Sequence, residues 1–414
     1  MSLINWIDDR FPLTKVWNEH LAQYYAPKNF NFWYYFGGLA VVVLVLQIVT
    51  GIILTMHYKP DADLAFASVE YIMRDVPAGW FVRYLHGVGA SMFFLVVYLH
   101  MFRGLMYGSY RNPRELIWIL GMVIYVALMA EAFFGYLLPW GNMSYWGAQV
   151  IISLFGALPV IGEPLAEWIR GDFVVSDATL NRFFAFHVIL LPLLLALLVY
   201  LHIVALHKVG SNNPDGIDIK KNKDKDGIPV DGIPFHPYYT VKDTFGIAVF
   251  MTIFLGIVFF VPELGGWFLE KDNFAPADIL QTPPDIVPLW YLTPYYSILR
   301  AVTFEWLPGG AKVWGVIAMG AAIVMFFFLP WLDRAKVRSI RYRGWMYKTA
   351  LTIFAVTFVM LGYLGTKNPG HIDLFLFENV IWAQIGMLLY FAFFLLMPIY
   401  TTLDRTKPEP DRVG

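Results

Sequence analysis

Eight apolar segments of about twenty residues each divide the chain, and they limit its fold more than any other feature. A helix of that length crosses about 30 Å of hydrocarbon, and membranes admit only helices or closed barrels as spanning structures. With 58% hydrophobic and 15% charged residues among 414, the composition is typical of a membrane protein. We therefore expect an all-α, polytopic membrane protein with eight transmembrane helices. The predicted spans are 34–56, 81–105, 116–138, 183–206, 244–261, 313–332, 347–364 and 380–402.

The connections between these segments differ in charge, and this predicts the side of the membrane on which each lies. Most of the 30 lysines and arginines fall in the two termini and in the second, fourth and sixth connections. Positive charge favours the cytoplasmic face, so we expect both termini there. We also expect three parts: an N-terminal four-helix bundle with an amphipathic leading segment at 1–213, a cytoplasmic connection at 214–243, and four further spans with an outer loop at 244–414.

Three other segments have patterns of their own. Residues 139–182 and 262–312 are long connections on the side opposite the termini and are rich in Pro, Gly and Trp. Long ordered loops commonly carry function, so we expect short helices there that roof a binding site. Residues 6–25 mix apolar and charged side chains, which favours an amphipathic helix along the cytoplasmic interface.

Four histidines lie inside the second and fourth predicted spans: His86 and His100 in one, His187 and His202 in the other. On straight helices, the two histidines of the first pair miss a common helix face by about 40° in one direction, and those of the second pair miss it by about 60° in the other. Their axial separations are roughly 21 and 22 Å. Two such helices side by side would offer one imidazole each at two levels. Facing helices can hold haem iron in this way. A proton relay through intramembrane histidines, as in a transporter, is the alternative interpretation.

Cysteine is absent from the sequence. Its absence excludes thioether attachment of haem, thiolate metal sites and iron–sulfur ligation by this chain. Together with the histidine pattern, it predicts two noncovalent b-type haems, each with two axial histidines, inside the bundle formed by the first four spans.

Four glycines repeat the interval of fourteen residues that separates the first two histidines. They are Gly37 and Gly51 in the first span and Gly121 and Gly135 in the third. A glycine allows close approach to the backbone, so each of these helices would present a notch at the level of each haem, where a porphyrin edge could lie against the main chain. Ordinary helix packing through small residues is the alternative interpretation.

Two arginines flank the histidines of the second span. Arg83 lies three residues before His86, and Arg103 lies three residues after His100, toward opposite membrane surfaces. An arginine in this position can neutralise haem propionates. Arginines at helix ends also extend to the interface without any ligand, which is the alternative.

Five long stretches of the sequence are specific enough to compare with a known family. They are RYLHGVGAS at 83–91, GYLLPWGNMSYWGA at 135–148, NRFFAFHVILLP at 181–192, LHKVGSNNPDG at 206–216 and IPFHPYYTVKD at 233–243. These stretches resemble the cytochrome b family, whose members form the central subunit of the quinol:cytochrome c oxidoreductase of respiratory complex III. The eight spans distinguish the chain from the split chloroplast relative, whose first half is a separate chain.

The resemblance implies an enzyme subunit that needs partners for turnover. It would oxidise quinol at an outer site, give one electron to a Rieske iron–sulfur protein, and pass the other through two haems to a quinone on the cytoplasmic side, coupled to proton translocation. It also implies a cytochrome c1-type partner, lipids, a homodimer of the whole complex and a bacterial inner membrane, with no nucleic acid. Alternatives are a proton-relay transporter and a di-haem, quinone-linked anchor of a membrane dehydrogenase.

The resemblance also assigns the haem ligands and an inner quinone site. The outer haem would use His86 and His187, and the inner haem His100 and His202. The spacing of fifteen in the second pair differs from the fourteen common in mitochondrial relatives and implies a slightly different rotation of one ring. The inner quinone site is implied at His207, Ser211, Lys242 and Asp243, where a histidine and a carboxylate can supply protons.

The outer quinol site departs from the family pattern at one residue. The usual Pro-Glu-Trp-Tyr motif reads PLWY at 288–291, and a leucine at position 289 cannot accept a proton. We hypothesise that another carboxylate replaces the glutamate, either Glu163 or Asp285, with Glu305 less favoured.

Four more residues complete the expected outer site. Tyr136 and Tyr296 match the aromatic lining of the family's pocket, and Gly147 matches its close approach to the quinol. With Tyr291, the last residue of the PLWY motif, the resemblance implies that these tyrosines take part in catalysis. At the inner site, Tyr35 stands where mitochondrial relatives commonly have an asparagine.

Overall fold

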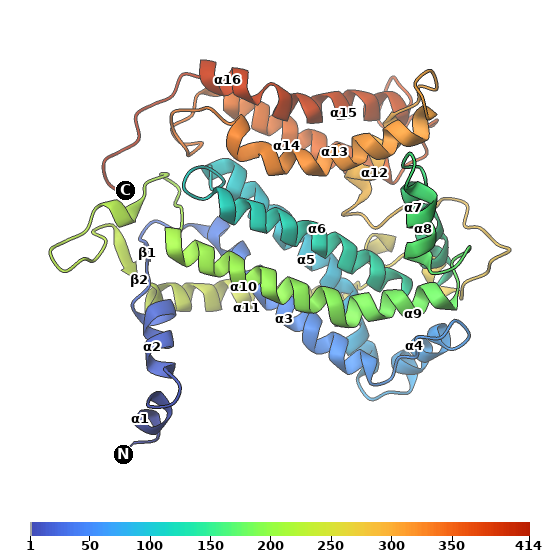
Figure 1. Cartoon of the computed structure of the whole chain (residues 1–414), viewed down its shortest axis with the longest axis horizontal. Coiled ribbons are helices and arrows are strands. Elements are labelled where there is room, and N and C mark those ends of the chain that lie inside the picture. The colour runs from blue at the N-terminus through green and yellow to red at the C-terminus, as the bar shows by residue number, and fades with distance from the viewer. Residues whose placement is uncertain (1) are drawn as a thin grey trace.

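The computed structural model describes residues 2–414 and confirms the all-α fold (Figure 1). Among these residues, seven helices are long and apolar enough to cross a membrane, and a bent pair brings the number to eight. Each predicted span coincides with one of them. They are α3 (Tyr35–Thr55) with η2 (Phe32–Tyr34), α5 (Gly79–Tyr107), α6 (Glu115–Leu137), the continuous α9 (Asp177–Ala185), η3 (Phe186–Leu190) and α10 (Leu191–Val209), η5 (Phe235–Tyr239) with α11 (Thr240–Phe260), α13 (Gly310–Leu332), α14 (Trp345–Gly365), and the pair α15 (Asn379–Leu395) and α16 (Met397–Leu403).

The spans form two groups. In the first, α3 packs against α5, α6 packs against α10, and α11 lies along α3 and α5. In the second, α13, α14 and α15 gather around the short helix α12 (Thr293–Ala301) (Figure 1). The fifth span, α11, therefore joins the first four in space, although it follows the polar connection that separates the halves in sequence.

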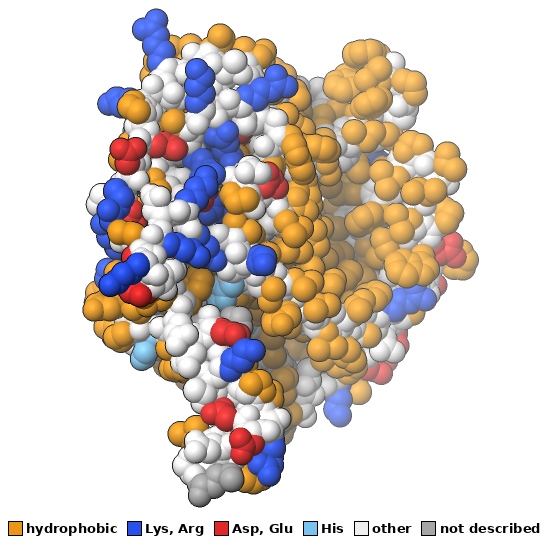
Figure 2. Space-filling view, turned by 60° about the vertical axis from the view of Figure 1, so that its left-hand side comes forward, with side chains coloured by type: hydrophobic (Ala, Val, Ile, Leu, Met, Phe, Trp, Pro, Cys, Tyr) orange, Lys and Arg blue, Asp and Glu red, His pale blue; other side chains and the backbone are white. Residues whose placement is uncertain are grey.

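The outer surfaces of the spans are apolar. Large side chains such as Ile52, Leu193 and Val359 are 56%, 68% and 71% exposed, which is the pattern expected where lipid replaces water. Lysines and arginines gather instead at the end of the molecule that holds both termini, as Figure 2 shows. We refer to this end as the terminal end and to the other as the opposite end.

The two long connections fold into short helices at the opposite end, as predicted. Residues 139–182 form α7 (Asn142–Gly156), α8 (Gly162–Arg170) and the first turns of α9, while residues 262–312 form η6 (Leu264–Gly266), η7 (Lys271–Phe274), α12 and the start of α13. A further short helix, α4 (Ala65–Arg74), joins α3 to α5.

The N-terminal segment differs from the single amphipathic helix expected over 6–25. It forms three short pieces: α1 (Leu3–Asp8), α2 (Leu13–Trp17) and η1 (Asn18–Ala22). Proline 12 stands directly before α2, and because a proline lacks an N–H and restricts the residue before it, the chain turns there instead of continuing as helix. The prediction of one continuous helix was wrong for this reason.

Polar contacts join the connection, the N-terminal segment and the C-terminal tail at the terminal end. Strand β1 (Tyr25–Pro27) pairs antiparallel with β2 (Gly232–Pro234), and η4 (Ile219–Lys221) lies in the same connection. Asp231 bonds both Arg412, at 2.9 Å, and Lys28, at 3.3 Å. These ion pairs hold three distant segments of the chain together.

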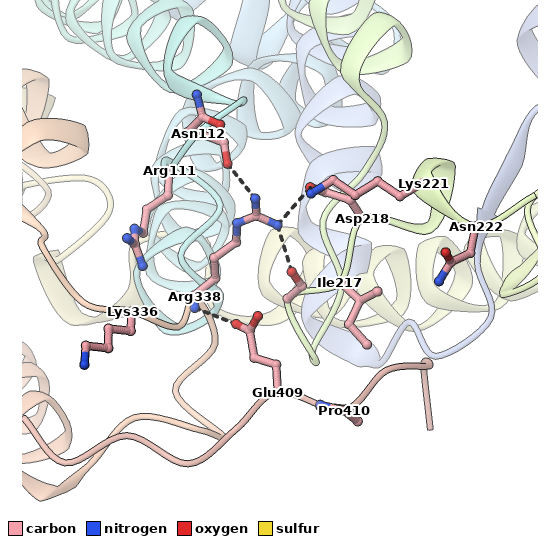
Figure 3. Close-up of a pocket in the computed structure, with 11 residues that line it drawn as sticks. Arg111, Asn112, Ile217, Asp218, Lys221, Asn222, Lys336, Arg338, Glu409 and Pro410 are labelled. Carbon is pink, nitrogen blue, oxygen red and sulfur yellow. Dashed lines mark hydrogen bonds and ion pairs between the residues drawn. The ribbon is translucent and has the colours of Figure 1, made fainter.

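A polar cavity of about 410 Å³ lies beside these contacts (Figure 3). Arg338 crosses it, donating to the carbonyls of Gly216 at 2.9 Å and Asn112 at 2.8 Å and pairing with Asp218 at 3.1 Å. Its own backbone N–H donates to Glu409 at 2.8 Å. The guanidinium thus joins the connection to the segment before α6, while the backbone N–H of the same residue holds the C-terminal tail through Glu409.

A buried ion pair between α13 and α14 gives a test of this end of the fold. Arg343 and Asp333 have fully buried side chains 2.5 Å apart, and Tyr110 donates to the same carboxylate oxygen at 2.6 Å. Arg343→Met would leave the buried carboxylate with only Arg111, 3.9 Å away, as a charged partner among the described residues, so we expect a loss of about 3–5 kcal/mol in stability, measured by thermal unfolding of the purified protein. Arg341→Met removes a half-exposed arginine from Asp215, to which Tyr342 and Asn29 still donate, and should cost less than about 1 kcal/mol. Equal unfolding temperatures for the two variants would contradict this.

Candidate haem and quinone sites

The four histidines form two pairs inside the first group of helices. His86 on α5 faces His187 on η3 with ring centres 6.0 Å apart, and His100 on α5 faces His202 on α10 with ring centres 6.5 Å apart. Two imidazoles that bind one metal through bonds of about 2 Å have ring centres roughly 6 Å apart. Each pair therefore leaves the width of a single metal ion between its rings.

A π-turn brings the second helix into phase with the first. Residues 186–190 form this turn, and the N–H of Leu191 donates to the carbonyl of Phe186, five residues earlier. A π-turn absorbs one residue more than an α-turn. The fifteen residues from His187 to His202 thus cover nearly the rotation of fourteen α-helical residues, so the second pair matches the interval from His86 to His100 despite its extra residue.

Hydrogen bonds at Nδ1 fix the tautomer of the two outer histidines. The Thr50 hydroxyl donates to the Leu46 carbonyl at 2.7 Å, so the same oxygen accepts from Nδ1 of His86 at 2.9 Å. Nδ1 of His187 donates to the backbone carbonyl of Glu131 at 2.9 Å. With the proton on Nδ1, each neutral ring keeps the lone pair of Nε2 for a metal. The donor set therefore fits an iron with two axial imidazoles.

The four glycines lie against the four imidazoles. A Cβ added at Gly37, Gly51 or Gly121 would lie 3.2–3.3 Å from Cε1 of His100, His86 and His202 respectively, and one at Gly135 would lie 2.3 Å from Cε1 of His187. The notches are thus at the predicted levels. They admit the histidine rings, whereas the sequence analysis expected porphyrin edges there.

Glu131 contacts His187 and was not predicted from the sequence as part of the site. Besides its backbone contact, its side-chain Oε1 lies 3.1 Å from Nδ1 of His187. A signal was available, because Glu131 is the only acidic residue in the eight predicted spans, and such residues are costly in hydrocarbon.

The two arginines take different positions. Nη2 of Arg103 lies 3.2 Å from Nδ1 of His100, and the guanidinium also covers the ring of Tyr34 at 4.9 Å. Arg83 lies over the next turn of its own helix, with Nη1 2.8 Å from where a Cβ of Gly87 would be. The structure thus brings Arg103 to the inner histidine pair and keeps Arg83 on the outer part of α5.

An apolar cavity at the opposite end collects the residues expected at the outer quinol site. The end of α6, helix α7 and the segment 286–296 enclose it, with a volume of about 40 Å³. Its lining includes Tyr136, Gly147, Leu289, Tyr291 and Tyr296. Three distant segments of the chain therefore converge as the sequence analysis expected.

None of the three carboxylates proposed for this site lines the cavity. Glu163 is exposed on α8 and lies beside Gly156, and Asp285 is exposed. Glu305 is exposed and accepts from the N–H of Ala311 at the start of α13, at 3.1 Å. The helix that carries Glu163 and the loops that carry the other two place all three side chains at the surface.

Glu270, which the sequence analysis did not consider, approaches the cavity instead. Its Oε2 accepts a hydrogen bond of 3.1 Å from the hydroxyl of Tyr136. Burial, opposed by that hydrogen bond and one from its own backbone, raises the pKa of Glu270 to about 7.

At the terminal end, Tyr24 links two residues of the expected inner quinone site. Its ring stacks on His207 with centres 4.5 Å apart, and its hydroxyl lies 3.1 Å from the hydroxyl of Ser211. Lys242 and Asp243 are on the first turn of α11, where the Lys242 ammonium lies 5.3 Å from the ring centre of Tyr239.

The first span closes against this turn of α11. A Cβ on Gly246, one turn after Asp243, would lie 2.9 Å from the ring of Tyr35. Tyr35, at the start of α3, therefore packs against α11 one turn from Asp243.

Comparison with known proteins agrees with this geometry. The family model described as Cytochrome b/b6/petB matches residues 21–210, and the model described as Cytochrome b(C-terminal)/b6/petD matches residues 276–391. The cytochrome b of Allochromatium vinosum is 61% identical over 414 residues, which cover 99% of this chain and 98% of that protein. A protein of Bradyrhizobium diazoefficiens named cytochrome b/c1 is 44% identical over 412 residues, which cover 99% of this chain and 56% of that protein.

A solved structure extends the agreement to the fold. A chain of the structure titled Hyperthermophilic respiratory Complex III superposes with a TM-score of 0.85 at 37% identity, covering 97% of this chain and 99% of that chain. Family models match both halves of the sequence, and the relatives align over almost its full length. The resemblance seen in the sequence is confirmed, and the chain belongs to the cytochrome b family.

Proposed function

We propose that the chain oxidises quinol at the opposite end of the molecule and reduces quinone at the terminal end, within a quinol:cytochrome c oxidoreductase. As a member of its family it is a haem-binding, electron-transferring membrane subunit of an oxidoreductase. The observation that carries the finer proposal is the pair of histidine sites, with rings 6.0 and 6.5 Å apart, at two levels between two candidate quinone sites.

Bound haem would supply one-electron transfer between the two ends. His86 and His187 would hold the outer haem, and His100 and His202 the inner one. The glycines opposite these rings let each imidazole lie against a neighbouring backbone, and Glu131 fixes the ring of His187 through Nδ1.

The ends of α5 would hold the haem propionates. Arg83 and Arg103 would pair with them through charge-assisted hydrogen bonds. Arg103 already reaches the inner pair, where its side chain contacts the ring of His100.

The terminal end would supply protons to a quinone as it is reduced. His207 and Asp243 carry groups that can donate protons, and Ser211 and Lys242 would orient the quinone oxygens. With the termini on the cytoplasmic side of a bacterial inner membrane, proton uptake here and release at the opposite end would charge that membrane.

Partners are needed for turnover. The sequence has no cysteine with which to hold an iron–sulfur cluster, so a Rieske protein would take the first electron. A cytochrome c1-type subunit would take it next, and the relative named cytochrome b/c1 supports that partner. Lipids and a second copy of the whole complex would complete the assembly.

Asp243→Asn tests the inner half of this scheme. We expect the variant complex to show haem b reduced by quinol through the outer site at the normal rate, whereas reoxidation of that haem by quinone slows on the order of a hundredfold, because the amide cannot donate a proton. Stopped-flow absorbance at the haem band measures both rates. Asp226→Asn, in an exposed turn of the connection, is the matched control.

Two outcomes would contradict the proposal. A purified complex with one haem b or none would remove the di-haem scheme. Normal reoxidation in the Asp243→Asn complex, with inhibitors acting at only one quinone site, would instead favour a simple anchor.

A further inference from the structure

The outer cavity lacks the proton acceptor that its family motif usually provides. Leu289 lines the cavity wall at that position, and its side chain has no group that can take a proton. Oxidation of a quinol to a quinone nevertheless releases two protons, and at least one group at the site must accept them.

We infer that Tyr136 and Glu270 together form the proton-accepting pair of the outer cavity. The inference rests on the proposed function of that cavity as a quinol-oxidation site. Tyr136 supplies the wall of the cavity, and Glu270, behind it, accepts its hydroxyl hydrogen bond at 3.1 Å.

A short set of backbone contacts holds Glu270 in this position. Just after Tyr136, the N–H of Asn142 donates to the carbonyl of Ala275 at 2.9 Å, and the carbonyl of Trp140 accepts from Ala277 at 3.0 Å. The side chain of Asn273 also accepts from the N–H of Ser144 at 2.9 Å. These hydrogen bonds fix the loop from three residues after Glu270 onward.

Gly141 shows how closely the two segments approach. A Cβ at this position would lie 2.2 Å from Oδ1 of Asn273 and 2.5 Å from its carbonyl oxygen. Only a residue without a side chain allows this approach. The loop that carries Glu270 is therefore held by a specific fit, and Glu270 reaches Tyr136 across 134 residues of sequence.

The surroundings of Glu270 suit a proton acceptor. The titratable groups around the pair are Tyr136 on α6, Tyr291 before α12 and Asp272 on its own loop. Lys271 is its immediate neighbour in sequence, and no cation contributes to the shift in the pKa of Glu270. Removal from water therefore governs its protonation, and the group is poised near neutral pH.

One proton moves through the pair for each O–H bond of the quinol that breaks. The O–H bond of the quinol breaks, and the phenolic oxygen of Tyr136 takes that proton while its own proton moves to Oε2 of Glu270. Tyr136 ends as it began, and the carboxylate becomes a carboxylic acid. The electrons leave to the one-electron acceptors of the proposed function, an iron–sulfur partner and the outer haem. Glu270, which is only partly buried, then releases this proton toward the outer water, and the pair takes up the second quinol proton in the same way, so two protons and two electrons leave for each quinol that is oxidised.

Glu270→Gln tests the pair directly. The amide keeps the size of the side chain and can accept from Tyr136, but it cannot be protonated. In the wild-type complex, quinol oxidation should rise with pH through about 7, because the carboxylate accepts a proton only once ionised. We expect the variant to lose this rise and to turn over on the order of a hundredfold more slowly above neutral pH.

Companion variants separate a proton role from a structural one. Glu270→Asp, which keeps a carboxylate, should keep the rise with pH, and Tyr136→Phe should lose it to the same extent as Glu270→Gln. The double variant Tyr136→Phe, Glu270→Gln should be no slower than either single one. Glu263→Gln, an exposed acid of the same connection, is the matched control and should behave as wild type.

The outcomes distinguish this inference from the function on which it rests. A Glu270→Gln complex with both haems and an unchanged pH profile overturns the inference while leaving the proposed function intact. If that variant fails to assemble, Tyr136→Phe decides, and a wild-type pH profile in it overturns the inference equally. A wild-type complex that neither oxidises quinol nor binds haem would instead overturn the proposed function.

Discussion

Leucine in place of His187 is expected to remove the outer haem and leave the inner one in place. His86 alone offers iron one imidazole, and a leucine of similar bulk fills the space without supplying a ligand. The haem content of the purified complex should fall to half, with one component lost from the reduced absorbance band. Quinol-driven reduction of the inner haem should stop as well, because the electron path from the outer cavity would be broken.

The second pair provides the matched experiment. His202→Leu should remove the other component of the same band and leave the outer haem reducible by quinol. Changing His86 together with His187 should cost no more haem than changing either one, since both belong to a single site. His371→Gln, on an exposed loop between α14 and α15, should change nothing. Loss of both haems from one single variant, or of none, would contradict the assignment of two separate sites.

The spans and the two histidine levels were predictable because each depends on local sequence. An apolar run of twenty residues is stable in a membrane as a spanning helix, so the position of the run in the chain largely determines where that helix lies. Histidine spacing on a helix likewise gives the level of each ring without reference to the rest of the fold. The fifteen-residue interval was the exception, because the π-turn at 186–190 that corrects its phase leaves no mark in the hydrophobic pattern.

The outer proton acceptor could not be predicted, because it depends on a loop that folds back over a great distance. Periodicity reports which residues share a face of one helix, and it does not report which loop side chains reach that face. Glu270 meets Tyr136 only because residues 273–277 pair with 140–144 through two backbone hydrogen bonds and one to the side chain of Asn273. Glu163 and Asp285 were equally plausible in sequence, and the structure leaves both exposed. Glu131, by contrast, was visible as the single acid of the predicted spans.

Alanine in place of Gly135 is expected to disrupt the outer haem site although it adds only one methyl group. The new Cβ would lie 2.3 Å from Cε1, 2.7 Å from Nδ1 and 2.8 Å from Nε2 of His187. Those distances are far below van der Waals contact, so the ring must move out of the position in which it faces His86. Overpacking of this kind commonly costs about 1–3 kcal/mol, and here the strain falls on a ligand whose placement the site requires. The complex should lose most of its outer haem, measured by the haem-to-protein ratio.

The other glycines make the expectation quantitative, because they differ in how closely an added methyl would approach a ring. Alanine at Gly37, Gly51 or Gly121 would lie 3.2–3.3 Å from its histidine, which small movements of the ring can accommodate, so haem should be retained with a shifted spectrum. Alanine at Gly38, with nothing within 4 Å, should leave the spectrum unchanged. If alanine at each of the four ring-facing glycines changed the haem content equally, the role of these glycines would be ordinary helix packing. Only the short distance to an imidazole distinguishes Gly135 from the other three.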